Sequence, residues 1–442
     1  MTDNRPAGQA GRVAARPEPW LAVVVLMLVG LLNYLDRILP GMLAEPIRRD
    51  LALSDTALGL INGAGFLLVY AVAGIPVSRL ADRGRYTAVI AGSLALWSAM
   101  TALGSVARSG LAFGATRLGV AVGEAGCTPS SQAFVSRHFA PERRGRALSL
   151  VALGSPIGLL AGMMGGGYLA GAFGWRLTCL MMGAAGLVFA PVVALVLRAA
   201  GPGSVTDPED GAAARAVPGH WYDLFRTRTG VLLVLAGSFI AIGGYSSNAF
   251  TAAFLMRVHG MTIADAGIRL GIGTGVFGVS AIVLTGWLAD RLSAAGDPRW
   301  IIRVAAGITG LTVPAWLAGY TVADTNLAVA CLAVGAGGMN CYVPLTVLAL
   351  YRLVEPEVRA RTSATLLFCT AVLGGLGPLV IGLISDSLAA RHAEQALGIA
   401  MLVVPAVFTL STLCYLAAGR TFAGDLQRRG EPDGLAAVPD FA

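Results

Sequence analysis

Residues 20–39, WLAVVVLMLVGLLNYLDRIL, form an apolar run of twenty residues that carries charge only at Asp36 and Arg37. An α-helix of about 20 predominantly apolar residues is long enough to cross the hydrocarbon core of a bilayer. Outward from this run, the chain contains eleven further stretches of comparable length and apolar character. The sequence therefore predicts an all-α membrane protein with twelve transmembrane helices.

The twelve predicted spans form two groups of six. The first group comprises residues 20–39, 57–77, 86–106, 111–136, 146–170 and 175–197, and the second comprises residues 231–255, 266–288, 300–320, 327–350, 361–384 and 396–416. The predicted domains are an N-terminal tail at 1–19, a six-helix bundle at 20–198, a linker at 199–229, a second six-helix bundle at 230–418 and a C-terminal tail at 419–442. We expect the two bundles to be pseudo-symmetric.

The composition supports a membrane protein and excludes several chemistries. Hydrophobic residues make up 56% of the chain and charged residues 13%, whereas soluble domains carry about 25% charged residues. The basic residues, 32 in total, are all arginine, which excludes a P-loop lysine and a Schiff-base lysine. Because no nucleophile–base pair and no metal-ligand spacing is apparent, we predict that the protein is not an enzyme and holds no metal or other cofactor.

The distribution of the arginines predicts the orientation in the membrane. Cytoplasmic loops carry an excess of arginine and lysine. With both termini inside, 23 of the 32 arginines lie on the cytoplasmic side, 7 lie outside, and Arg37 and Arg117 lie within spans. We therefore expect a multi-pass protein of the cytoplasmic membrane with both termini in the cytoplasm. This bias explains the net charge of +7, so nucleic acid is not an expected partner.

A short motif recurs at equivalent positions of the two halves. Residues 80–83 (LADR) follow the second span, and residues 288–291 (LADR) follow the eighth. Such duplication predicts a substrate site between the halves, near the middle of the membrane. The loops predict a gating latch that forms in one conformational state, and a plain topology signal is the alternative. The predicted latch residues are Asp82, Arg83, Arg85, Asp290 and Arg291.

Two acidic residues lie well inside the predicted spans, Asp36 in the first and Glu124 in the fourth. A carboxylate at membrane depth costs at least about 2.5 kcal/mol, so such residues usually serve ions or protons. Arg37 follows Asp36, and Arg117 lies two helical turns before Glu124 on the same face. We predict that Asp36 and Glu124 couple transport to protons and control the access of an anion to the arginines. Ion pairs that merely join the two helices are the alternative.

Further residues complete the predicted site. The predicted substrate-binding residues are Asn33, Tyr34, Arg37, Arg117, Tyr245 and Asn248. Glycine and proline in the fifth and eleventh spans favour either bending or close packing. The predicted hinge residues are Gly154, Pro156, Gly377 and Pro378.

The sequence contains a further set of short motifs: residues 33–37 (NYLDR), Arg117 with 123–126 (GEAG), 141–144 (PERR), 286–291 (GWLADR), and 377–378 with 382–386 (GLISD). In these motifs the chain resembles the major facilitator superfamily, and specifically its spinster-like branch. The resemblance implies alternating access between two six-helix bundles, with Asp36, Arg37 and Glu124 in the coupling site. It also implies an amphipathic substrate with an anionic head, such as a lysophospholipid or sphingosine-1-phosphate. Ser78 departs from the glycine that usually begins the first loop motif.

These observations predict a proton-coupled secondary transporter that moves an amphipathic, anionic, lipid-like substrate and acts as a monomer. Protons and membrane lipids are its other expected partners. A drug or organic-anion transporter with the same machinery is the alternative.

Overall fold

The computed structural model describes residues 19–201, 223–293, 297, 299–339, 341–355 and 358–428, and its elements are helices. Ten of the described helices are long and apolar enough to cross a membrane. One of them, Pro141–Ala199, has 59 residues and breaks at Gly174, where φ is 77°, so it contains both the fifth and the sixth predicted spans. The fourth predicted span consists of two shorter helices that meet near Glu124. The prediction of twelve spans in two bundles is therefore confirmed.

The N-terminal bundle contains α1 (Trp20–Met42), α2 (Ala44–Asp50), α3 (Asp55–Gly59), η1 (Leu60–Ala64), α4 (Gly65–Leu80), η2 (Ala81–Arg85), α5 (Tyr86–Gly104), α6 (Gly110–Glu124), α7 (Cys127–His138), α8 (Pro141–Ala152) and α9 (Gly154–Ala199). The C-terminal bundle contains η4 (Asp223–Arg226), α10 (Arg228–Val258), α11 (Ile263–Ser293), α12 (Trp300–Thr321), α13 (Thr325–Met339), α14 (Tyr342–Leu353), α15 (Arg359–His392), η6 (Ala393–Gln395), α16 (Ala396–Met401) and α17 (Val403–Gln427).

Several spans begin at a residue that caps the helix. The side-chain oxygen of Ser54 accepts a hydrogen bond from the Ala57 amide at 3.1 Å, and Ser109 and Thr227 do the same at the starts of α6 and α10. Such caps pair backbone donors that the first helical turn leaves without partners. The starts of these three helices, α3, α6 and α10, are thus encoded locally by a hydroxyl residue directly before the helix.

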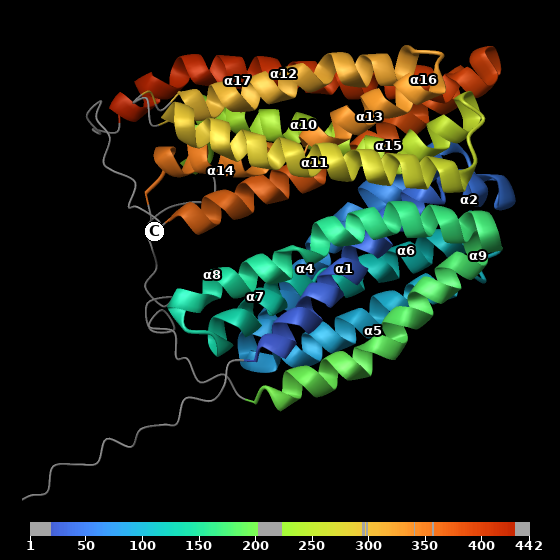
Figure 1. Cartoon of the computed structure of the whole chain (residues 1–442), viewed down its shortest axis with the longest axis horizontal. Coiled ribbons are helices and arrows are strands. Elements are labelled where there is room, and N and C mark those ends of the chain that lie inside the picture. Colours follow the sequence, from blue (N-terminus) through green and yellow to red (C-terminus); the bar gives the residue numbers. More distant parts are fainter. Residues whose placement is uncertain are drawn as a thin grey trace, which may run out of the picture.

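The two bundles touch at one end of the molecule and diverge at the other (Figure 1). Within the bundles, α9 packs on α1 and α5, and α10 packs on α15 and α17. Between the bundles, α9 packs on α11, α15 on α3 and α1 on α10. We call the end that carries α2 the closed end, and the end that carries Trp20 and Arg428 the open end.

Glycines bring helix backbones into direct contact at the closed end. A Cβ on Gly59 would lie 2.6 Å from the carbonyl carbon of Pro378, and a Cβ on Gly382 would lie 2.6 Å from that of Asp55. Such residues allow α3 and α15 to approach more closely than side chains would permit. Gly84, in the first loop motif at the open end, has no atom within 4 Å of the equivalent Cβ position.

We expect Gly59→Ala to weaken the closed end. The added methyl group would meet backbone atoms of α15, and overpacking of this kind costs about 1–3 kcal/mol. The population in which the closed end separates should rise by roughly five- to hundredfold. Distances between spin labels on α8 and α14 report this shift. Gly92→Ala, on α5 with open space around it, is the control, and an equal response of the two variants would contradict the prediction.

The predicted hinge residues lie at close helix contacts. The fifth span is interrupted between Ala152 and Gly154, one turn before Pro156, and a Cβ on Gly154 would lie 2.9 Å from the Leu31 amide nitrogen. In contrast, α15 continues through Gly377 and Pro378. These contacts agree with the packing alternative, and the hinge role stays a prediction.

The predicted latch residues lie at the open end. Arg83, Arg85 and Arg291 are exposed, and the Arg291 guanidinium lies 5.4 Å from the Trp287 ring centroid. The side chains of Asp82 and Asp290 lie outside the described part of the chain, so the latch remains a prediction.

Candidate functional site

The charged centre of the N-terminal bundle lies where α6 ends. α6 ends at Glu124 and α7 begins at Cys127, so the fourth span is interrupted beside its acidic residue. A Cβ on Gly123 would lie 2.7 Å from the Trp97 amide nitrogen, so only glycine permits α6 to pack this closely on α5. This contact holds Glu124 in the interior of the bundle, where its side chain has no exposed surface.

The first ion pair joins α1 to the end of α6. Arg37 donates from Nη2 to Glu124 Oε2 at 2.7 Å and from Nε to the same oxygen at 3.1 Å. The Arg37 side chain is 20% exposed, whereas that of Glu124 is 0% exposed. Arg37 is therefore the more accessible member of this pair.

The second ion pair lies deeper in the bundle. Arg117 Nη1 donates to Asp36 Oδ2 at 3.4 Å, and the Thr101 hydroxyl donates to Asp36 Oδ1 at 2.7 Å. The side chains of Arg117 and Asp36 are 6% and 7% exposed. Both members of this pair are nearly inaccessible.

The pairing crosses between the helices. Asp36 and Arg37 are adjacent on α1, and Arg117 and Glu124 lie on one face of α6, yet each carboxylate bonds to the arginine of the other helix. The sequence spacing identified the four residues but not their partners. The geometry agrees with ion pairs between the first and fourth spans, and the role in proton coupling stays a proposal.

Aromatic rings surround the two guanidinium groups. The Arg37 Cζ atom lies 4.8 Å from the ring centroid of Tyr70, 5.5 Å from that of Tyr34 and 5.9 Å from that of Phe66. Phe66 also lies 5.0 Å from Arg117 Cζ. A cation over an aromatic face is stabilised by the ring quadrupole. Sequence reasoning missed Phe66 and Tyr70, because their approach to the arginines depends on the placement of α4, which packs against α6.

Three buried polar atoms near this centre have no hydrogen-bond partner among the described residues. They are Glu124 Oε1, Arg117 Nε and Asn33 Nδ2. A cavity of about 10 Å³ adjoins Asp36, Thr101 and Arg117, which is about the space that one water molecule needs. The centre therefore retains hydrogen-bonding capacity that the protein itself does not use.

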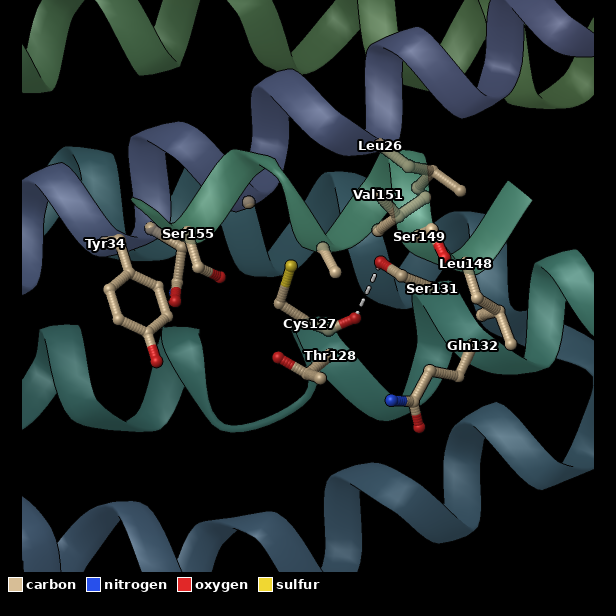
Figure 2. Close-up of a pocket in the computed structure, with 13 residues that line it drawn as sticks. Leu26, Tyr34, Cys127, Thr128, Ser131, Gln132, Leu148, Ser149, Val151 and Ser155 are labelled. Carbon is tan, nitrogen blue, oxygen red and sulfur yellow. Dashed lines mark hydrogen bonds between the residues drawn. The ribbon is translucent and has the colours of Figure 1, made fainter. Parts of the chain in front are cut away.

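A larger cavity adjoins the charged centre, because Tyr34 lines it and also lies over Arg37. Figure 2 shows residues that line this cavity. It has a volume of about 410 Å³ and is bounded by α1, α7, α8 and the start of α9. Asn33 and Tyr34, predicted as substrate-binding residues, line it. The predicted residues of the C-terminal bundle do not line this cavity. Tyr245 lies near Arg37 and packs against the core of the N-terminal bundle, and Asn248 lies opposite Gly41 at the α1–α10 contact.

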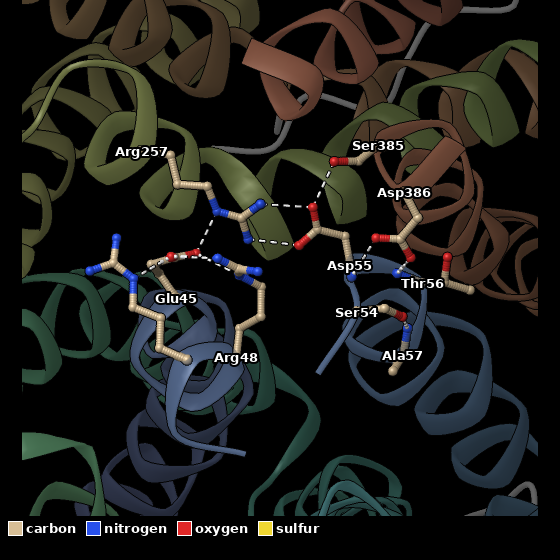
Figure 3. Close-up of polar contacts among 10 residues, drawn as sticks. Glu45, Arg48, Ser54, Asp55, Thr56, Ala57, Arg257, Ser385 and Asp386 are labelled. Atoms are coloured by element: carbon tan, nitrogen blue, oxygen red, sulfur yellow. Dashed lines mark hydrogen bonds and ion pairs between the residues drawn. The ribbon is translucent and has the colours of Figure 1, made fainter. Parts of the chain in front are cut away.

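A cluster of charged side chains joins the bundles at the closed end (Figure 3). Arg257, at the end of α10, donates from Nη1 and Nη2 to the two carboxylate oxygens of Asp55, each at 2.7 Å. Its Nε donates to Glu45 on α2. Arg257 is thus held between two carboxylates of the other bundle.

The same cluster anchors the start of the second span. Asp386 on α15 accepts hydrogen bonds from the backbone amides of Asp55 and Thr56 at 3.0 and 2.8 Å, and the Ser385 hydroxyl donates to Asp55 at 2.6 Å. In the sequence, residues 382–386 contributed to the family resemblance, but Asp386 was assigned no role. The partners lie 330 and 331 residues apart in the chain, so no local pattern reveals them.

Glu45 is ionised in this cluster over the physiological pH range. Burial alone would raise its pKa, but the hydrogen bond from Arg48 and the charge and hydrogen bond of Arg257 outweigh burial and lower the pKa to about 2. Because the charged form carries the contacts, their stabilisation is present at neutral pH and is lost only as the pH falls toward 2.

The comparisons with known proteins agree with this architecture. A family model described as Major Facilitator Superfamily matches residues 26–378. An MFS-type efflux pump of Mycolicibacterium smegmatis is 44% identical over 408 residues, covering 92% of this chain and 94% of that protein. Protein spinster homolog 1 of Homo sapiens is 27% identical, covering 83% of this chain and 73% of that protein.

A solved structure supports the same relationship. The crystal structure of a bacterial homolog to the human lysosomal transporter spinster, in an inward-facing and unoccupied conformation, has a TM-score of 0.82 at 27% identity, covering 93% of this chain and 99% of that chain. A structure described as inward-facing and occupied has a TM-score of 0.78. The family match, the long relative and the shared fold lead to one conclusion: this chain belongs to the major facilitator superfamily, is similar to its spinster-like members, and is a multi-pass membrane transporter rather than an enzyme.

Proposed function

We propose that the protein is a proton-coupled secondary transporter of an amphipathic, anionic substrate that resembles a lysophospholipid or sphingosine-1-phosphate. The observation that carries this proposal is the Arg37–Glu124 pair, in which an accessible arginine is bonded to a fully buried carboxylate. A guanidinium group is well suited to bind a phosphate or a carboxylate. The rings of Tyr34, Phe66 and Tyr70 around it suit a substrate that is partly apolar.

The pair links substrate charge to proton binding. A substrate anion and the Glu124 carboxylate compete for the same guanidinium group. If the substrate anion binds Arg37 while Glu124 stays ionised, the buried Glu124 carboxylate loses its partner, which is strongly unfavourable. Protonation of Glu124 removes this cost, so an anion and a proton bind together at this pair. This arrangement corresponds to symport.

The Asp36–Arg117 pair provides a second proton site. Its side chains are only 6–7% exposed, so a proton reaches Asp36 through a conformational change or through the water-sized cavity beside it. Buried acids in membrane proteins commonly mark proton relays. We assign Asp36 to the step that returns the empty protein.

The conformation supports alternating access. With both termini in the cytoplasm, as the arginine distribution predicts, the open end faces the cytoplasm and the closed end faces outward. The structure then corresponds to an inward-facing state, which is also the printed description of the similar bacterial structure. Transition to the opposite state requires separation of α3 from α15 and of Arg257 from its carboxylates.

A drug or organic-anion exporter is the second candidate. It is favoured by the 44% identity to a mycobacterial protein described as an efflux pump. Export in exchange for protons predicts proton movement opposite to the substrate, whereas the charge competition at Arg37 predicts movement in the same direction. The direction of proton movement therefore separates the two candidates.

Arg37→Gln tests the proposed function. We would reconstitute the protein in liposomes that contain a pH dye and add short-chain lysophospholipids, sphingoid phosphates or organic anions. The wild type should acidify the lumen as an anionic substrate enters. Arg37→Gln should reduce anion transport by roughly ten- to hundredfold, because it removes charge-assisted hydrogen bonds worth about 1.5–3 kcal/mol.

Arg391→Gln is the matched control, because Arg391 is an exposed arginine at the closed end. It should transport like the wild type. Alkalinisation of the lumen on substrate entry would replace the symport proposal with the exchange mechanism. Equal losses for anionic and uncharged substrates in Arg37→Gln would contradict the role of Arg37 in anion binding.

A further inference from the structure

The cavity beside the charged centre is built entirely from the N-terminal bundle. Leu26, Gly30, Asn33 and Tyr34 of α1 line it, with the spacing that places them on one helical face. Arg37 continues this face four residues beyond Asn33. The cavity volume of about 410 Å³ lies in the range of small-molecule sites.

The cavity wall combines hydrogen-bonding groups with apolar surface and carries no charge. Thr128, Ser131, Gln132, Ser149 and Ser155 supply polar groups, and Leu26, Leu148 and Val151 supply apolar surface, as Figure 2 shows. The Ser131 hydroxyl donates to the Cys127 carbonyl oxygen at 2.9 Å, so its own oxygen remains available as an acceptor. A ligand with a second ionised group would find no opposite charge in this wall. The wall therefore suits an uncharged part of the ligand.

Asn33 identifies the chemistry that the cavity requires. The residue is buried, with 5% of its surface exposed, and its Nδ2 amide has no hydrogen-bond partner in the part of the chain that the structure describes. A buried donor without a partner costs about 1–3 kcal/mol. A bare alkyl chain would leave this cost in place, whereas a ligand with an oxygen acceptor removes it.

The position of Asn33 relative to Arg37 limits the distance between the two ligand groups. Residues four apart on a helix have Cβ atoms about 5–6 Å apart. Tyr34 lies between the two sites, because it lines the cavity and its ring is 5.5 Å from Arg37 Cζ. One ligand reaches both residues when its acceptor oxygen lies a few bonds from its anionic group.

We propose that this cavity is a subsite for an uncharged, oxygen-bearing part of the substrate, such as a hydroxyl or an ester carbonyl, and that the Asn33 amide donates to that oxygen. The assignment rests on the proposed function, because it takes the anionic group of the same substrate to be bound at Arg37. Such a subsite selects substrates that carry an acceptor oxygen close to the anionic group, and it disfavours simple alkyl phosphates.

The test compares two probes with the same anionic group and the same chain length. One is 1-octanoyl-glycerol 3-phosphate, which carries a hydroxyl and an ester carbonyl, and the other is octyl phosphate, which carries neither. Calorimetric titration of the purified full-length protein measures both affinities. The wild type should bind the glycerol phosphate roughly tenfold more tightly, as one buried hydrogen bond predicts.

Asn33→Leu removes the amide and keeps the branching and the number of heavy atoms of the side chain. It should weaken binding of the glycerol phosphate and leave octyl phosphate unchanged, so that the ratio of affinities falls to about one. Asn62→Leu is the matched control, because Asn62 is a half-buried amide on η1 that does not line the cavity. Val151→Phe fills the cavity from α8 without changing Asn33 and should also lower the ratio.

Each result decides between defined alternatives. If the wild type binds both probes equally, or if Asn33→Leu weakens both equally in a protein of normal thermal stability, the subsite assignment is overturned while anion binding at Arg37 stands. If Asn62→Leu lowers the ratio as much as Asn33→Leu, the assignment is also overturned. If the folded wild type binds neither probe, the proposed anionic substrate and the subsite are both wrong.

Discussion

Asp36→Asn is expected to reduce substrate-driven proton movement to the level of protein-free liposomes while substrate counterflow continues. Asparagine has nearly the same volume and still accepts the hydrogen bond from Thr101, which is 2.7 Å long in the wild type. It binds no proton at physiological pH. Counterflow exchanges substrate without net proton movement, so it does not need Asp36 to titrate. The assay uses a trapped pH dye for proton movement and labelled substrate for counterflow.

The loss of charge at Asp36 also leaves Arg117 as a buried cation without its partner. An unpaired buried charge costs about 3–5 kcal/mol, whereas removal of both charges is often neutral or stabilising. The double variant Asp36→Asn with Arg117→Gln should therefore recover thermal stability but not proton movement. Asp50→Asn, at a carboxylate that is 45% exposed, is the control for the amide change. Proton movement at the wild-type level in Asp36→Asn would refute its role.

Arg257→Gln is expected to open the closed end. The change leaves the carboxylates of Asp55 and Glu45, which are 6% and 1% exposed, without the cation between them. Breaking a buried pair in this way costs about 3–5 kcal/mol, which corresponds to a shift of a hundredfold or more in the population of the open form. Spin-label distances between α3 and α15 measure the shift, and net transport should fall because one conformational state dominates.

The matched control is Arg269→Gln, because Arg269 also lies near the closed end but bonds to Asn326 on the exposed surface. It should leave the distances unchanged. The double variant Arg257→Gln with Asp55→Asn removes the buried carboxylate that loses its arginine, while Glu45 keeps Arg48 and Arg49 as partners, and it should recover most of the closed form. If Arg257→Gln alone keeps the wild-type distances, glycine packing rather than the charged cluster holds the closed end.

The low pKa of Glu45 predicts how the spin-label distances at the closed end depend on pH. A carboxyl group whose pKa is lowered in the folded protein stabilises it above its usual pKa of about 4.3. That contribution is lost only as the pH falls toward the folded value, which for Glu45 is about 2. The closed end should therefore keep the same label distances from pH 8 to pH 5. Opening over that interval would show that another group controls it.

The fold was predictable because each span carries its own signal. An apolar run such as residues 20–39 needs no partner to indicate a membrane helix. The break at Gly174 falls between the predicted spans 146–170 and 175–197, so the sequence placed it correctly. The interruption near Glu124 was not foreseen, because the apolar run 111–136 continues through it and the break depends on how α6 packs on α5.

The site was predictable in its residues and not in its contacts. Asp36, Arg37, Arg117 and Glu124 stood out because charge is expensive in a membrane, but their crossed pairing depends on the rotation of α1 against α6. The sequence analysis did not single out Arg257, although it forms the centre of the cluster at the closed end. Its partners come from the other half of the chain, and sequence spacing carries no information about such contacts.

The crossed ion pairs have an evolutionary consequence. Both pairs belong to the N-terminal bundle, so the two copies of the ancestral unit have diverged in what they contribute. On the proposed mechanism, one copy carries the groups that bind protons, and the other is free to change without disturbing them. New cargo preferences would then arise in the second copy, while the proposed link to the proton gradient stays in the first.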